Sequence, residues 1–95
     1  MSLYRQQAYQ SIQLSSARVY IFNMNTKILK RLGENLKKYR KVAQLTQEQL
    51  AELVGIHPTY VGKLETGKNN PSVKMLYKLS RALKIKLSDI FDFDK

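Results

Sequence analysis

Apolar residues recur at a helical spacing in the first part of the chain that follows residue 26. They lie three or four positions apart, as expected for one face of an amphipathic helix. The apolar set is Ile28, Leu29, Leu32, Leu36 and Tyr39. Basic residues occupy the remaining faces. The pattern predicts a first helix that begins near Lys27 and buries one apolar face.

Capping residues mark the next two helices. Thr46 and Gln49 have the spacing of a capping box, in which each side chain bonds a backbone amide near the other residue. Gly55 suits the left-handed residue that ends a helix. Pro58 suits the first position of the following helix, where its missing N–H has no partner to lose. The residues expected to face the core are Leu50, Leu53 and Val54, then Val61 and Leu64.

Two more helices follow the turn at residues 69–72. Gly67 ends the third helix, and Ser72 is the expected N-cap of the fourth. Ser88 is the expected cap of a short fifth helix. The inward residues of these two helices are Met75, Leu76, Leu79, Ala82 and Leu83, then Leu87, Ile90 and Phe91. Five short helices joined by tight turns predict an all-α fold.

Residues 1–26 differ from the rest, because they contain only the two charges of Arg5 and Arg18. Residues 18–22 are β-branched and aromatic, which is typical of a strand. A short apolar run of this kind is also compatible with a helix. Residues 3–14 fit a weak polar helix, and Met24 is an alternative translation start. We therefore divide the chain into an N-terminal extension, 1–23, expected to act as a dimerisation arm, and a domain at 24–95.

The charge balance points to a polyanionic partner. Seventeen basic residues stand against seven acidic ones, for a net charge of +10, and such proteins are drawn to nucleic acids. There are no cysteines, so disulfides and thiolate sites are excluded, and a cytoplasmic location is expected. No apolar run approaches the ~20 residues of a membrane span. One histidine, His57, makes no metal site, and we expect no cofactor.

The second and third helices form a helix-turn-helix arrangement. The turn is at residues 55–57, and the small Ala51 lets the two helices approach. Val61 and Leu64 would hold the third helix on the core, so that its other face points outward. A major groove about 12 Å wide admits such a helix.

The same residues carry a family resemblance. Residues 32–91 resemble a lambda-repressor/Cro-type (XRE-like) helix-turn-helix domain through the stretches 32–40, 45–51, 55–56, 60–61, 63–67, 70–72 and 87–91. Residues 59–72 also resemble restriction–modification controller proteins. The resemblance implies a five-helix lambda-repressor-like DNA-binding domain, here with an N-terminal extension. The chain departs from the family pattern at His57, Gly62 and Lys84.

The resemblance also implies contact residues. Base contacts fall on Pro58, Thr59, Gly62 and Lys63. Phosphate contacts fall on Gln47, Tyr60, Lys68, Asn69 and Asn70. Alternatives stay open: a lysine that touches only phosphate, a Tyr60 that packs, a solvent-exposed Gln47, and asparagines that serve only the turn. In the family an arginine of the first helix pairs with a glutamate of the third, which implies an Arg40–Glu65 pair.

Together these features predict a DNA-binding transcriptional regulator, located in the cytoplasm and on the nucleoid when bound. We expect it to bind double-stranded DNA as a homodimer on a roughly palindromic operator, with residues 58–66 in the major groove. Apolar residues of the fifth helix, Leu87, Ile90, Phe91 and Phe93, would supply a dimer surface. The alternative is an antitoxin-type protein that binds both DNA and a partner protein. The sequence has no nucleophile–base set, phosphate-binding glycine loop or metal cluster, so we expect no enzyme.

Overall fold

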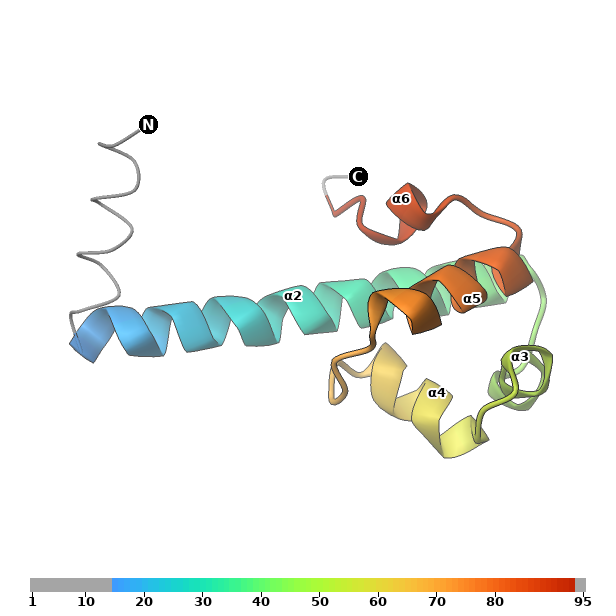
Figure 1. The fold of residues 1–95 in the computed structure, drawn as a ribbon, viewed down its shortest axis with the longest axis horizontal. Coiled ribbons are helices and arrows are strands. Elements are labelled where there is room, and N and C mark those ends of the chain that lie inside the picture. The colour runs from blue at the N-terminus through green and yellow to red at the C-terminus, as the bar shows by residue number, and fades with distance from the viewer. Residues whose placement is uncertain (1–14, 94–95) are drawn as a thin grey trace.

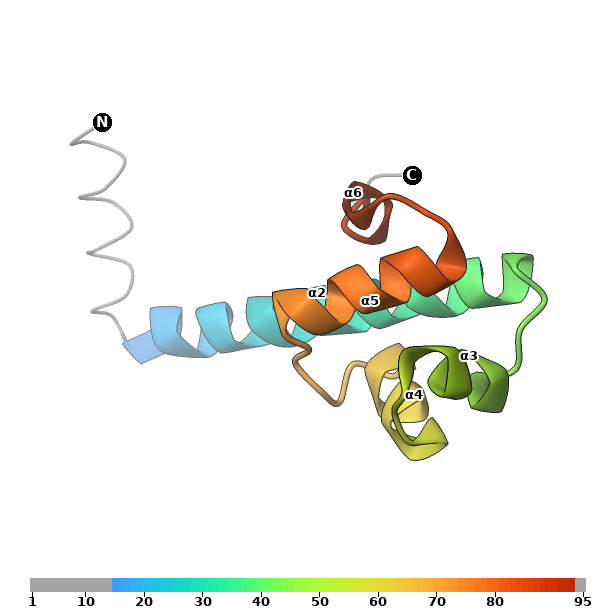
Figure 2. The ribbon, with the colours of Figure 1, turned by 45° about the vertical axis from the view of Figure 1, so that its right-hand side comes forward.

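The structure, a computed structural model, describes residues 15–93, with side chains from residue 26. This range forms five helices and no strand (Figure 1): α2 (Ser15–Val42), α3 (Gln47–Val54), α4 (Pro58–Glu65), α5 (Val73–Leu83) and α6 (Leu87–Ile90). The long α2 crosses the whole view, with α6 on one side of it and the α3–α4 pair on the other (Figure 2). The predicted all-α fold is confirmed.

The N-terminal half of α2 corrects two expectations. Of the strand and the helix left open for residues 18–22, the strand is wrong, because these residues belong to α2, and that helix begins at Ser15 rather than near Lys27. No glycine or proline occurs between residues 15 and 32, and adding residues to an existing helix is far easier than nucleating one. The helix expected at residues 3–14 lies outside the described residues.

The capping residues fix the helix boundaries largely as predicted. Thr46 Oγ1 accepts from the Gln49 amide at 3.0 Å, and Gln49 Oε1 accepts from the Thr46 amide at 2.8 Å. Gly55 is left-handed, with φ 82°. Ser72 Oγ accepts from the Met75 amide at 3.0 Å. The capping box, the glycine stop and the serine cap are all confirmed.

Of the caps of α4 and α6, only that of α6 differs from the expectation. His57 caps α4 itself, since its Nδ1 accepts from the Thr59 amide at 3.1 Å. Ser88 does not cap α6, because the N-cap is Lys86, whose amide donates to Asp89 Oδ2 at 2.9 Å. The cap therefore lies two residues earlier than expected and uses a carboxylate, which also suits the positive end of a helix.

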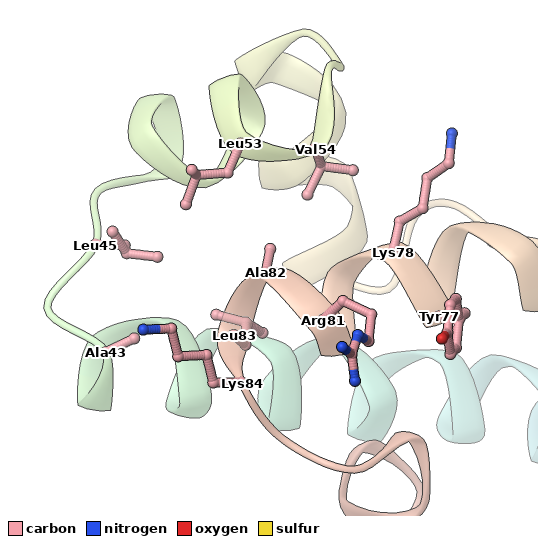
Figure 3. Close-up of a pocket in the computed structure, with 10 residues that line it drawn as sticks. All are labelled: Ala43, Leu45, Leu53, Val54, Tyr77, Lys78, Arg81, Ala82, Leu83 and Lys84. Carbon is pink, nitrogen blue, oxygen red and sulfur yellow. The ribbon is translucent and has the colours of Figure 1, made fainter.

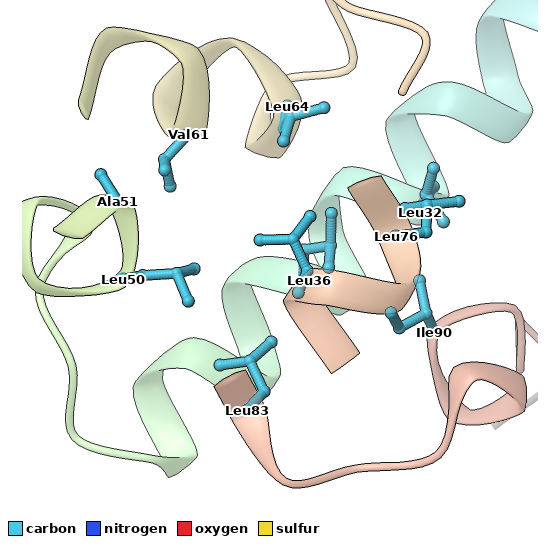
Figure 4. Close-up of a cluster of buried hydrophobic side chains, with 10 residues drawn as sticks. Leu32, Leu36, Leu50, Ala51, Val61, Leu64, Leu76, Leu83 and Ile90 are labelled. Atoms are coloured by element: carbon cyan, nitrogen blue, oxygen red, sulfur yellow. The ribbon is translucent and has the colours of Figure 1, made fainter. Parts of the chain in front are cut away.

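Every helix contributes to one small core (Figure 4). The buried residues are Leu32, Leu36, Leu50, Ala51, Val61, Leu64, Leu76, Leu79, Leu83 and Ile90. Three residues expected to face inward are instead substantially exposed: Ile28 by 49%, Leu53 by 62% and Phe91 by 45%. In the described part of the chain, no helix is long and apolar enough to cross a membrane.

Side chains of α2 hold α6 through backbone carbonyls. Asn35 Nδ2 donates to the Ile90 and Asp92 carbonyl oxygens at 2.8 and 3.1 Å. Arg31 Nη2 donates to the Phe93 carbonyl oxygen at 2.7 Å, and its guanidinium lies 5.6 Å from the Phe93 ring centroid. These contacts fix the C-terminal segment on the face of α2 opposite α4 (Figure 1).

Two glycines allow α2 and the end of α4 to touch. A Cβ at Gly33 would lie 2.7 Å from the Glu65 carbonyl oxygen and closer still to that of Leu64. A Cβ at Gly67, which has φ 75°, would lie 2.8 Å from the backbone of Lys30. The orientation of α4 therefore depends on two positions that cannot accept a side chain without movement of the backbone.

Candidate nucleic-acid interface

The site begins with the way α3 and α4 meet. Ala51, on the inner face of α3, is only 1% exposed, and Val61 of α4 is equally buried. The left-handed Gly55 donates its amide to the Ala51 carbonyl oxygen at 2.8 Å, which closes α3 and turns the chain toward α4. The expected helix-turn-helix arrangement is present, and it leaves one face of α4 uncovered.

A shallow groove lies between the start of α3 and this uncovered face. Its volume is about 420 Å³. It is lined by Gln47, Glu48, Pro58, Thr59, Gly62, Lys63, Thr66 and Lys68. All four residues predicted to contact bases are among them, together with Gln47 and Lys68 from the predicted phosphate set. Residues from two helices and the following loop thus form one continuous surface.

Three residues of the predicted phosphate set do not line this groove. Tyr60 is half-buried and packs against the core. Asn69 and Asn70 lie in the loop that follows Lys68, where Asn70 is exposed and Asn69 is half-buried. These positions are at the margin of the surface.

Two residues of the groove were missed from the sequence, Glu48 and Thr66. Thr66 Oγ1 donates to carbonyl oxygens of the last turn of α4, Gly62 at 3.1 Å and Lys63 at 3.3 Å, so its hydroxyl is already engaged. Glu48 is exposed beside Gln47. Its carboxylate repels phosphates and is able to accept a hydrogen bond from the amino group of cytosine. The sequence signal that could have identified Glu48 is its place next to Gln47 in the first turn of α3.

Behind the groove, Arg40 and Glu65 form a buried ion pair. Arg40 Nε donates to Glu65 Oε2 at 2.6 Å, and Nη2 donates to Oε1 at 3.1 Å. The two residues are 8% and 6% exposed. Planar two-point pairing of this kind is the strong form of a charged hydrogen bond. The pair joins the C-terminal part of α2 to the last residue of α4.

The same carboxylate holds a residue of the groove. Gln47 Nε2 donates to Glu65 Oε1 at 3.0 Å. Since the amide nitrogen carries two hydrogens, one remains available on the side chain that lines the groove. Arg40 Nη1 also donates to the Leu45 carbonyl oxygen at 2.7 Å, which fixes the loop before α3. One network therefore positions α2, α3 and α4 relative to one another.

The groove has the electrostatic character of an anion-binding surface. Lys63 and Lys68 are exposed beside the N-terminus of α3. The first amides of a helix lack internal partners and point outward, so this end favours negative charge. Residues 15–93 hold no group of three or more histidine, cysteine or acidic side chains suited to a metal ion. The surface can bind phosphates at its edge and present α4 side chains at its centre.

Comparison with known proteins identifies the family. The helix-turn-helix family model HTH_3 matches residues 36–90. An HTH-type transcriptional regulator of Archaeoglobus fulgidus is 43% identical over 60 residues, which cover 63% of this chain and 84% of that protein. Control protein C.SmaI of Serratia marcescens is 44% identical over 52 residues, 55% of this chain and 62% of that protein.

The fold is also that of a solved controller protein. The crystal structure of the restriction–modification controller protein C.AhdI from Aeromonas hydrophila is similar with a TM-score of 0.65 and 38% sequence identity. The match covers 66% of this chain and 96% of that one. Both the predicted lambda-repressor-like fold and the resemblance to controller proteins are confirmed. The chain belongs to the HTH_3 helix-turn-helix family, and it is a transcriptional regulator, not an enzyme, with a helix-turn-helix DNA-binding domain.

Proposed function

We propose that the protein is a homodimeric regulator that binds a roughly palindromic operator, with α4 in the major groove. The observation that carries this proposal is the single surface formed by the start of α3, the uncovered face of α4 and Lys68. Two copies related by a two-fold axis would read two half-sites about one helical turn apart. One domain contacts only a few base pairs. Binding two half-sites doubles the number of base pairs that a dimer distinguishes.

In this proposal the base contacts come from Pro58, Thr59, Gly62 and Lys63. Thr59 offers a methyl group to thymine or a hydroxyl to a base edge, and Lys63 can donate to guanine O6 and N7. Both side chains are exposed. The helix packs without a side chain at Gly62, which permits close approach to the DNA.

The phosphate contacts come from the margin of the same surface. The assigned residues are Gln47, Tyr60, Lys68, Asn69 and Asn70. Gln47 would bond phosphate through the amide hydrogen that Glu65 does not use, so the ion-pair network would position a DNA contact. Tyr60 packs partly against the core, and its hydroxyl is the part assigned to the DNA.

Substitutions at Thr59 and Lys68 separate the two kinds of contact. Thr59→Ala should change base preference and weaken binding to the preferred site by up to about tenfold, because one base contact is lost. Lys68→Ala should weaken all sequences alike and reduce the slope of log affinity against log salt by about one, as expected for one lost phosphate contact. Fluorescence anisotropy with preferred and scrambled duplexes at several salt concentrations measures both effects.

Lys86→Ala is the matched control, since it removes an exposed lysine at the start of α6, on the far side of α2 from α4. It should leave the salt slope nearly unchanged. Equal changes in base preference from Thr59→Ala and Lys68→Ala would contradict the assignment of separate roles.

The dimer surface is proposed on α6 and the residues after it. Leu87 and Phe93 are half-buried and Phe91 is 45% exposed, so their apolar area is partly available. Ile90, which was expected to contribute, is completely buried and cannot reach a partner. The Phe91 and Phe93 rings meet edge to face, with centroids 6.4 Å apart. Together the two rings would form the aromatic part of the proposed dimer surface.

We assign residues 1–23 to an additional dimerisation arm. The backbone of α2 is helical from Ser15 and projects beyond the other helices (Figure 1). The projecting part of α2 continues a helix whose C-terminal half is packed in the domain, and a second copy is proposed to pair with it. Deleting residues 1–23 should weaken dimerisation about tenfold in sedimentation equilibrium. A truncated protein that dimerises as tightly as the full chain would remove the arm from the proposal.

A further inference from the structure

A second, larger groove lies away from the DNA-binding surface, between α3 and the C-terminal half of α5 (Figure 3). Its volume is about 990 Å³. Its lining includes Leu53, Val54, Tyr77, Lys78, Arg81 and Lys84. None of these residues lines the groove proposed to face DNA. We call this second site the α3–α5 groove.

The walls of the α3–α5 groove are mainly apolar. Leu53 is 62% exposed and Tyr77 is 54% exposed, although both are large apolar side chains on well-packed helices. Leu45 and Val54 come from the α3 side, and Ala82 stands opposite them on α5 (Figure 3). Exposed apolar side chains that gather in one place are typical of an interaction surface, whereas single scattered ones are not.

One edge of the groove is basic. Lys78, Arg81 and Lys84 follow one another at intervals of three residues along the C-terminal half of α5 and its cap. No acidic residue lines the groove. Among the side chains that the structure describes, residues 26–93, no carboxylate is found paired with any of these three. The edge therefore presents positive charge that the described chain does not neutralise.

The backbone at Lys84 is an independent indication. This residue ends α5 in the left-handed region, with φ 57° and ψ 41°. Glycine is the favoured residue in that conformation, and a side chain there costs stability. Strain of this kind is typical of functional positions. Lys84 thus stands at the edge of the groove in a backbone conformation that glycine would adopt more easily.

We propose that the α3–α5 groove binds a segment of another protein that carries carboxylates beside large apolar side chains. The apolar side chains would cover Leu53 and Tyr77, and the carboxylates would pair with Lys78, Arg81 and Lys84. Nucleic acid fits less well, because phosphates gain nothing from the exposed leucine and tyrosine. This binding function is separate from the proposed DNA binding and does not rest on it.

Selection from a random peptide library tests the proposal with the full-length protein. Peptides of about 15 residues, roughly four helical turns, are long enough to span a groove between two short helices. The library is selected against the unaltered protein and, in parallel, against Leu53→Ser and against Lys78→Glu/Arg81→Glu. All three substituted positions are exposed, so the variants should fold, and their thermal melting checks this.

We expect the enriched peptides to combine acidic with large apolar residues. Their affinity should fall about tenfold or more in either groove variant. Leu53→Ser removes an apolar contact, and Lys78→Glu/Arg81→Glu removes cations that pair with the peptide carboxylates. Lys74→Glu/Lys86→Glu is the matched control, because it makes the same charge change at exposed positions outside the groove. This control should keep peptide affinity within about twofold, and an operator duplex should not displace the peptide.

Several results would overturn the proposal. The first is a selection in which the unaltered protein enriches no peptide more strongly than the groove variants do. Equal weakening by the control charge variant would show that the peptides respond only to net charge. A loss of duplex affinity in Lys78→Glu/Arg81→Glu but not in the control would assign the basic edge to DNA. Dissociation of the dimer by Leu53→Ser would assign the groove to a second copy of the chain.

Discussion

Replacing Gly33 by alanine is expected to lower the free energy of unfolding by about 3 kcal/mol, the upper part of the range for overpacked positions. Helix propensity alone would favour alanine by up to about 1 kcal/mol. The added methyl group would meet the carbonyl oxygens of Leu64 and Glu65 at distances that packed atoms never adopt. Neither atom can move aside by a side-chain rotation, so α2 and α4 must separate.

Thermal unfolding measures this effect, which corresponds to a fall in Tm of roughly 12–24 °C for a domain of this size. Gly62→Ala is the matched control, since it also adds one methyl group inside a helix. A Cβ at Gly62 would lie 3.8 Å from the Gln47 side chain, an ordinary contact. This variant should be more stable than the unaltered protein by about 0.5–1 kcal/mol. An unchanged Tm for Gly33→Ala would refute the close approach of α2 and α4.

Glu65→Gln is the second substitution with a large expected effect, a loss of about 3 kcal/mol. The change removes the charge that balances Arg40, whose guanidinium is buried in the protein. It also disturbs the carboxylate that accepts from Gln47. Urea denaturation measures the loss. DNA affinity, measured where the variant is still folded, should fall as well, because Gln47 loses its fixed orientation.

Two further variants serve as controls for Glu65→Gln. Glu52→Gln removes an exposed carboxylate from α3 and should change stability by less than about 0.5 kcal/mol. Arg40→Met combined with Glu65→Met should recover much of the stability, since apolar pairs often replace buried ion pairs well. A melting curve for Glu65→Gln that matched the unaltered protein would contradict a buried, structurally important pair.

Local sequence signals were sufficient for most helix boundaries. The Thr46–Gln49 box, Gly55, Pro58 and Ser72 act within one turn of the residue that they cap, so their effect is readable without tertiary information. The Asp89 cap of α6 was missed because Ser88 offered an equally good local cap. Asn35 of α2 also binds the Ile90 and Asp92 carbonyl oxygens, so α6 is held by tertiary contacts that the local sequence does not show.

Tertiary context accounts for the main errors. Residues 18–22 have the side chains of a strand, but helix propagation from the packed part of α2 decides their backbone. Leu53 has the spacing of a core residue on α3, yet the space beside it is an open groove. The need for glycine at residue 33 depends on how closely two helices pass, and a glycine inside a helical pattern is its only sequence signal.

The candidate site was predicted in a different way. Periodicity and caps placed α3 and α4, and the resemblance to a known family supplied the residues on their outer face. The structure gathers Gln47, Thr59, Lys63 and Lys68 around one groove. It adds Glu48, which no pattern singled out. The link from Gln47 to Glu65 could not be predicted, because it joins residues whose separation in space depends on the whole fold.

The most direct measurement is the selection of bound sites from a random duplex library by the full-length protein at about 150 mM salt, where binding driven by charge alone is weakened. We expect enrichment of an inverted repeat whose half-sites lie about one helical turn apart. That result would establish a symmetric dimer that reads sequence through α4. Binding without enrichment of any sequence would contradict it, and would mean that the basic charge alone attaches the protein to DNA.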